Sequence, residues 1–192
     1  LEMKLEHYKK HPIIKGFRHV LQAETDRKFM LDPQFMKGIG LLSKYNFTYD
    51  ILIYTDQLQY INKFVAEFPE QKFVIDHLAK PNIKEKSIEE WESDIYAVSE
   101  YENVYCKISG MVTETDWKHW EQHDFTPYLD TIVNAFGTDR IMFGSDWPVC
   151  LVAATYKNVV EIVSNYFFSF SSTEQSKIFR DNAIYFYNLN NV

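Results

Sequence analysis

The sequence predicts an α/β fold in which helices cover a parallel sheet. Short apolar segments rich in β-branched and aromatic residues alternate strictly with segments of helical periodicity. The composition is that of a globular protein, with 46% hydrophobic and 24% charged residues. At a length of 192 residues, we expect residues 1–192 to form a single domain with a substantial core.

Each element is predicted from its own pattern of apolar residues. Strands are expected at residues 13–20, 48–54, 72–78, 103–109 and 141–143, where apolar runs end in polar or turn-forming residues. Helices are expected at residues 1–11, 32–42, 56–68, 87–98, 125–136, 156–168 and 173–188. A polar, Trp-rich segment at residues 113–123 is expected to form a loop.

Several helix ends carry capping signals. Asp32 followed by Pro33 is a favourable helix start, and Asp56 is expected to cap the next helix. The sequence Ser-Ile-Glu-Glu at residues 87–90 has the form of a capping box. Gly137 is expected at the end of the helix at residues 125–136.

Charge and hydropathy exclude several classes of partner. The formal net charge of −7, without a basic cluster, argues against nucleic-acid binding. No apolar run approaches the roughly 20 residues of a membrane span, and no secretory signal opens the chain. Cys106 and Cys150 are too few for a disulfide framework, so we expect a reducing, cytoplasmic location.

Polar side chains recur where the predicted strands end. In parallel α/β sheets, ligands bind at the carboxyl ends of the strands. In chain order, these ends carry Arg18 and His19; Tyr54 and Asp56; Asp76 and His77; Lys107 and Ser109; and Ser145, Asp146 and Trp147. The five ends together therefore predict a site at one edge of the sheet.

Each of these residues also has an ordinary structural interpretation. His19 could be a core histidine, Arg18 an ion-pair partner, Lys107 an outward-facing side chain, and Asp146 a cap for the next element. We expect Asp50 and Asp76 to support structure as caps or as partners of site residues, and Trp117 and Trp120 to pack. His7, His11, His119 and His123 lie in polar segments and are expected to be solvated.

A His and an Asp beside cationic groups suit hydrolysis by general-base catalysis. Asp146 would take a proton from water, or Asp146 and His77 would together hold a divalent metal that acidifies the water. Arg18, His19 or Lys107 would stabilise an oxyanion or hold a carboxylate or hydroxyl-rich substrate. The sequence contains no Gly-rich phosphate loop and no Gly-x-Ser-x-Gly motif.

Four ordered motifs resemble one known family. They are Ile-Lys-Gly-Phe-Arg-His-Val (14–20), Phe-Val-Ile-Asp-His-Leu-Ala-Lys-Pro (73–81), Val-Tyr-Cys-Lys-Ile-Ser-Gly (104–110) and Ile-Met-Phe-Gly-Ser-Asp-Trp-Pro-Val-Cys (141–150). The chain resembles the amidohydrolase-related proteins of the "amidohydrolase 2" type, which are TIM-barrel hydrolases. Within that family it is most similar to the sugar-lactone hydrolases that act on fuconolactone or rhamnonolactone.

The resemblance implies a partial TIM (β/α)8 barrel in which the five predicted strands are numbers four to eight. The single domain at residues 1–192 would then be the C-terminal five-eighths of a barrel. His77 matches the family's strand-six histidine, and Asp146 matches its strand-eight catalytic aspartate. Substrate-binding positions are implied at Arg18, His19, Tyr54 and Lys107. Trp147, beside Asp146 at the same strand ends, is a further candidate for substrate binding.

The chain departs from the family in lacking a His-x-His motif and the first three strands. Five strands do not close a barrel, so we expect either a fragment of a longer protein or a truncated gene product. Exposed sheet edges would favour self-association, and a homo-oligomer is one expected outcome. The resemblance leaves the cofactor open between one divalent metal, such as zinc held by His77 and Asp146, and none.

The resulting hypothesis is a lactonase that hydrolyses a sugar lactone or a related cyclic ester, with Asp146 as general base. His77 would orient the water or polarise the carbonyl, while Arg18, His19 and Lys107 hold the substrate's oxygens. Two alternatives remain at this point: a metal-dependent amidase or decarboxylase of the same superfamily, and an inactive remnant or interaction protein.

Overall fold

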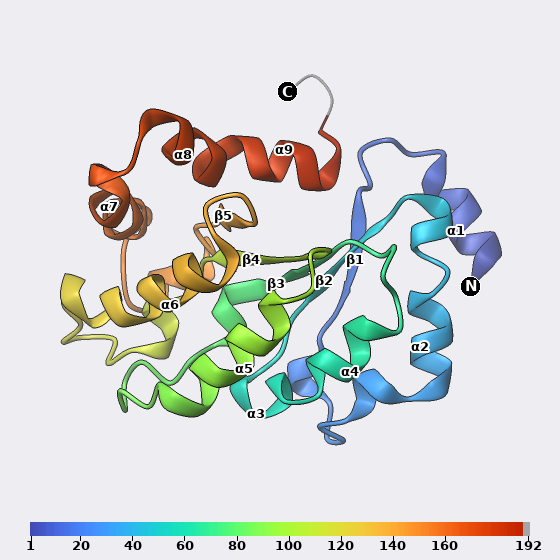
Figure 1. Ribbon diagram of the computed structural model, residues 1–192, viewed down its shortest axis with the longest axis horizontal. Coiled ribbons are helices and arrows are strands. Elements are labelled where there is room, and N and C mark those ends of the chain that lie inside the picture. Colours follow the sequence, from blue (N-terminus) through green and yellow to red (C-terminus); the bar gives the residue numbers. More distant parts are fainter. Residues whose placement is uncertain (190–192) are drawn as a thin grey trace.

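The fold is built on one sheet of five parallel strands, seen in a computed structural model that describes residues 1–189 (Figure 1). The strands are β1 (Gly16–His19), β2 (Thr48–Ile51), β3 (Phe73–Ile75), β4 (Val104–Ile108) and β5 (Ile141–Phe143). Their spatial order, β1-β2-β3-β4-β5, is their order along the chain. All carboxyl ends therefore lie at one edge, as the alternation of strand and helix predicts.

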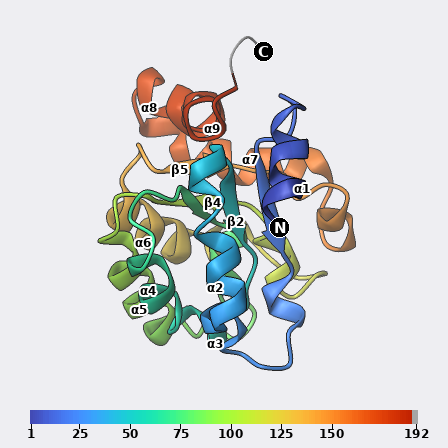
Figure 2. The ribbon, with the colours of Figure 1, turned by 90° about the vertical axis from the view of Figure 1, so that its right-hand side faces the viewer.

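Helices connect the strands and cover both faces of the sheet. They are α1 (Glu2–Lys9), α2 (Pro33–Ile39), α3 (Thr55–Leu58), α4 (Ile61–Ala66), α5 (Glu89–Ser99), α6 (Thr126–Phe136), α7 (Tyr156–Tyr166), α8 (Ser172–Ser176) and α9 (Asn182–Tyr187). A π-helical turn at Lys177–Asp181 joins α8 to α9. Figures 1 and 2 show α4, α5 and α6 on one side of the strands and α9 on the other.

Alternation along the strands divides the apolar residues between the two faces. In β3, Phe73 and Ile75 belong to the large core beneath the helices, whereas Val74 points to the opposite face. There Val74 packs with Tyr105, Met142 and Phe186, the last of which comes from α9. A strand buried on both faces reads as a continuous apolar run, as β3 does.

The predicted order and type of the elements are confirmed, but two predicted caps are wrong. Asp32 does cap α2, accepting hydrogen bonds from the backbone N–H groups of the next turn. Asp56 is not a cap, because α3 starts at Thr55 and Asp56 lies inside its first turn, where the carboxylate pairs with Arg27 at 2.6 Å.

The helix α5 starts at Glu89 without a side-chain cap, so the capping box predicted at residues 87–90 is absent. The two cysteines, Cys106 and Cys150, are buried and unbonded. Within residues 1–189, every helix is too short or too polar to cross a membrane.

Candidate active site

A left-handed turn after β3 delivers His77 to the carboxyl edge of the sheet. His77, Leu78, Ala79 and Lys80 all have positive φ, between 54° and 57°, although none is glycine. L-residues adopt this conformation at a cost of roughly 1–2 kcal/mol each. Such strain persists only where the surroundings hold it, and it is concentrated at functional sites.

Neighbouring side chains bind the carbonyls of this turn. The Trp91 indole donates to the Leu78 carbonyl at 2.6 Å, and the Thr55 hydroxyl donates to the Lys80 carbonyl at 2.6 Å. Both partners come from other elements, so the turn is clamped from outside. The sequence alone predicts a strand through Leu78, because the apolar run continues past Ile75.

The His77 ring occupies a close-fitting seat formed by β4 and the residues after it. Its Nδ1 shares a hydrogen bond of 2.8 Å with the Ser109 hydroxyl. A Cβ atom on Gly110 would lie 2.7 Å from that Nδ1, so a larger residue there would displace the ring. Burial lowers the pKa of His77, and the nearby Asp146 opposes that shift. Burial therefore favours the neutral imidazole, whose Nε2 faces Asp146.

Asp146 follows β5 and faces the same imidazole. Its Oδ1 lies 3.8 Å from His77 Nε2, and the two side chains are 16% and 13% exposed. Asp146 also has positive φ, at 54°, although it is not glycine. Among residues 1–189, no donor forms a hydrogen bond to its carboxylate, which leaves both oxygens available to a ligand.

Four charged side chains form an ion network beside this pair. Lys107 lies 2.6 Å from Asp50 and 2.7 Å from Asp76, and Arg18 binds the second oxygen of Asp76 at 2.9 Å. Burial disfavours the charged form of Lys107, but Asp50 and Asp76 outweigh it and raise the pKa. We call Arg18, Asp76, Lys107 and Asp50 the charge network.

Arg18 is the member of the charge network that reaches the solvent. Its side chain is 48% exposed, whereas that of Asp76 is 1% exposed. The hydrogen bond to Asp76 raises the pKa of Arg18, and Asp146 contributes to the same shift through space. A permanent cation thus stands within the field of the Asp146 carboxylate, where an anionic or oxygen-rich ligand would meet it.

The hydroxyl of Tyr187 completes the charge network from α9. It lies 3.0 Å and 2.8 Å from the two oxygens of Asp50. Sequence reasoning missed this residue, because the two partners are 137 positions apart and Tyr187 looks like one more apolar residue of its helix. Asp50 and Asp76, expected to support structure, do so here as the anionic half of the network.

The other predicted binding residues lie around the charge network without joining it. His19 Nε2 is 2.6 Å from Glu24, and Trp147 is 62% exposed. The ring of Tyr54 lies between Arg27 and Lys80, at 5.8 Å and 5.4 Å from its centroid. The structure thus gathers Arg18, Lys107, His77 and Asp146 and leaves these three outside their contacts.

The described residues do not form a complete metal site. A catalytic zinc takes three protein ligands and leaves a fourth position open. His77 and Asp146 would supply two at most, and within residues 1–189 no group of three His, Cys, Asp or Glu side chains is placed to hold one ion. The residues that the structure describes thus do not fit a catalytic zinc by themselves.

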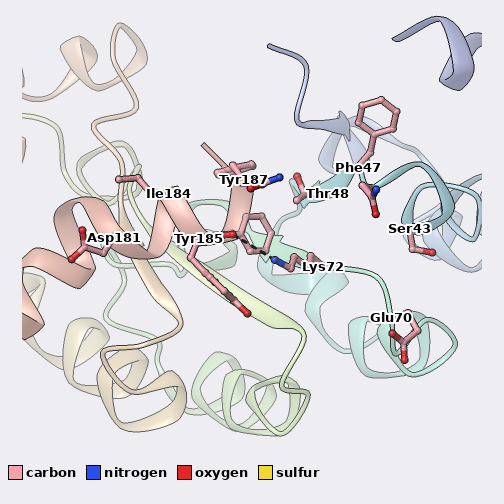
Figure 3. Close-up of a pocket in the computed structure, with 12 residues that line it drawn as sticks. Ser43, Phe47, Thr48, Glu70, Lys72, Asp181, Ile184, Tyr185 and Tyr187 are labelled. Atoms are coloured by element: carbon pink, nitrogen blue, oxygen red, sulfur yellow. Dashed lines mark hydrogen bonds between the residues drawn. The ribbon is translucent and has the colours of Figure 1, made fainter. Parts of the chain in front are cut away.

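One cavity lies away from this edge. It has a volume of about 710 Å³ and lies between α9 and the amino ends of β2 and β3 (Figure 3). Lys72 points there toward Tyr185, with its Nζ 4.5 Å from the centre of the ring. Because ligands of parallel sheets bind at the carboxyl ends, this cavity is not the candidate active site.

Comparison with known proteins gives the chain its relatives. The chain is 35% identical over 181 residues to an L-fucono-1,5-lactonase of Burkholderia multivorans, which covers 88% of this chain and 61% of that protein. It is 25% identical to an L-rhamnono-gamma-lactonase of Scheffersomyces stipitis, covering 92% of this chain and 60% of that protein. The chain thus spans about three fifths of the length of these relatives.

A solved structure agrees with the sequence relatives. A crystal structure of a Burkholderia multivorans amidohydrolase with bound zinc superposes with a TM-score of 0.88 and 36% identity, covering 91% of this chain and 64% of that one. The predicted fold class, five parallel strands of the TIM-barrel type with surrounding helices, is confirmed. The family model for amidohydrolases matches residues 4–189. The chain belongs to the amidohydrolase family.

Proposed function

We propose that the protein hydrolyses a sugar lactone at the carboxyl edge of its sheet. The observation that carries the proposal is the facing pair of His77 and Asp146, with a carboxylate free of protein donors among the described residues. The names of the fucono- and rhamnono-lactonase relatives support a cyclic sugar ester as the substrate class.

In the proposed reaction, Asp146 acts as general base. It takes a proton from water as the water oxygen attacks the lactone carbonyl, which gives a tetrahedral oxyanion. The ring C–O bond then breaks, and the proton returns from Asp146 to the departing ring oxygen. The products are a free hydroxyl group and a carboxylic acid, so one water is consumed and no other reactant is needed.

His77 and Arg18 would stabilise the charge that develops on the carbonyl oxygen. When the Ser109 hydroxyl donates to Nδ1, the neutral His77 ring carries its proton on Nε2, where it can donate to the oxyanion. Arg18 supplies an exposed guanidinium for the substrate's oxygens. Lys107 acts on Arg18 indirectly, because both side chains bind Asp76. His19, Tyr54 and Trp147 would border the sugar.

The test is lactone hydrolysis by the Asp146→Asn protein, measured with L-fucono-1,5-lactone and an L-rhamnonolactone. We expect kcat to fall by about 10²–10⁴-fold, the usual contribution of general-base catalysis. Asp116→Asn, at a half-exposed carboxylate outside the charge network, is the matched control and should retain turnover. Normal turnover by Asp146→Asn would remove this residue from the mechanism. An inactive but folded wild-type protein would favour a remnant or interaction protein.

A further inference from the structure

The charge network ends at a residue of α9, the helix that covers the same face of the sheet. Asp50 is mostly buried, with 18% of its side chain exposed, and its oxygens are bound by Lys107 and by the Tyr187 hydroxyl. Lys107 also lies 5.6 Å from the centre of the Tyr187 ring. The lysine is thus held on two sides by residues that also contact each other.

The sheet fixes the position of α9, and with it that of Tyr187. Phe186 is buried against Val74, Tyr105 and Met142 on the face that α9 covers. At the start of the helix, the side-chain amide of Asn182 donates to the carbonyls of Thr138 and Ile141. With both ends of α9 attached to the sheet, the Tyr187 hydroxyl is presented to Asp50 by a rigid support.

We propose that Tyr187 is a positioning residue for substrate binding, an inference that rests on the proposed lactonase function. By binding Asp50, it keeps Lys107 shared between Asp50 and Asp76. Because Lys107 then neutralises one oxygen of Asp76, the Arg18 guanidinium needs to satisfy only the other. Its remaining N–H groups stay directed to the solvent-facing side, where the lactone binds.

Removing the Tyr187 hydroxyl changes the balance along this chain of contacts. Asp50 loses its second partner, and a buried carboxylate without enough donors attracts the nearest cation more strongly. Lys107 would shift toward Asp50 and away from Asp76. Asp76 is 1% exposed and has no access to water, so Arg18 would turn inward to replace the lost charge. The substrate then meets a less available guanidinium.

The kinetic test compares Tyr187→Phe with Tyr185→Phe. Both substitutions remove one phenolic hydroxyl from α9 beside the same cavity, but Tyr185 is 67% exposed and its hydroxyl lies outside the charge network. For Tyr187→Phe we expect KM to rise about tenfold, the scale of a lost hydrogen bond to a charged group, with kcat within about twofold. Tyr185→Phe should match the wild type in both constants.

A second measurement does not depend on turnover. The ¹⁵N NMR signals of the Lys107 ammonium and the Arg18 Nε–H, assigned with Lys107→Met and Arg18→Lys, report the contacts of these groups directly. We expect both signals to shift in Tyr187→Phe and neither to shift in Tyr185→Phe.

The outcomes separate this inference from the proposed function. An unchanged Arg18 signal in Tyr187→Phe, or an unchanged KM in an active protein, would overturn the positioning role. A loss of thermal stability with neither effect would do the same, because it shows a purely structural contact. A shifted Arg18 signal in a protein without lactonase turnover would support the coupling and reject the lactonase function.

Discussion

At the scale of single residues, two glycines allow the candidate site to form. Gly110 has a φ of +63° and lies against the His77 ring, where a Cβ would come within 2.9 Å of three ring or side-chain atoms. Gly144 lets β5 approach β4, since a Cβ there would lie 3.1 Å from that of Ser109. The absence of two side chains therefore sets the positions of the imidazole and of its hydroxyl partner.

The Gly110→Ala substitution should damage the site more than its backbone strain explains. Gly137→Ala is the matched control, because Gly137 also has positive φ, at +62°, but a Cβ added there would meet no atom within 4 Å. Each should lose roughly 1–2 kcal/mol of unfolding free energy from the left-handed conformation. Gly110→Ala should lose about 1–3 kcal/mol more from overpacking and should reduce kcat sharply. Denaturant titration and lactone assays measure both effects, and equal losses in the two variants would contradict the account.

At the scale of elements, the turn at His77–Lys80 determines where the histidine points. A strand continuing to Leu78 would alternate its side chains across the sheet. The left-handed turn instead rotates the chain at the end of β3, and Trp91 of α5 holds it by its carbonyl. The geometry of His77 is thus a property of β3, α5 and their connection together.

Trp91→Phe should therefore impair catalysis as well as stability. It removes the indole N–H that binds the buried Leu78 carbonyl, at an expected cost of about 1–3 kcal/mol in unfolding free energy. Trp117→Phe removes a comparable bond, to the Thr113 carbonyl, from an exposed loop, and should change stability little. Turnover measured well below the melting temperature should fall only in Trp91→Phe. Full activity in that variant would show that the turn holds its shape without the indole.

At the scale of the whole molecule, the charge network ties together strands that are not neighbours. Lys107 of β4 bridges Asp50 of β2 and Asp76 after β3, and Arg18 of β1 binds the other oxygen of Asp76. Burying such charges is costly unless each is paired, and breaking a buried pair leaves an uncompensated charge. The mutual pairing in the charge network is therefore what makes it possible to bury these charged side chains on the sheet.

Lys107→Met should lower the unfolding free energy by about 3–5 kcal/mol at neutral pH. Lys44→Met breaks the exposed pair with Glu2 and should change stability little. The effect of Lys107→Met should shrink in acid. Burial raises the pKa of Asp50, so the folded chain takes up this proton before the unfolded chain, and acid favours the folded state at that group. Urea titrations from neutral pH down to the pH range in which carboxylates titrate test this. A difference in unfolding free energy between the wild type and Lys107→Met that widens in acid would refute it.

Local patterns predicted most of the fold, because strand and helix periodicity depends on neighbouring residues. Asp32 with Pro33 identified a true cap for the same reason. The cap predicted at Asp56 is wrong, because its partner Arg27 lies 29 residues away and no local pattern signals it. The strand ends predicted that His77 and Asp146 lie together, since parallel connections place all carboxyl ends at one edge.

The remaining features depend on contacts that no local pattern carries. The left-handed turn contains no glycine or asparagine to signal it. Tyr187 can contact Asp50 only after the chain between them, 137 positions long, has folded into the sheet. The catalytic roles of the predicted residues, the use of a metal, the single-domain boundary and the oligomeric state stay predictions.

The contact between Tyr187 and Asp50 also has a consequence for the order of events during synthesis. Each strand pairs with the next strand along the chain, so the sheet can grow one unit at a time as the ribosome releases it. The Tyr187 hydroxyl that binds Asp50, by contrast, is synthesised 137 residues later. Until α9 emerges and docks, the Asp50 carboxylate of a nascent sheet would lack one of its partners, and the position of Arg18 would not yet be fixed.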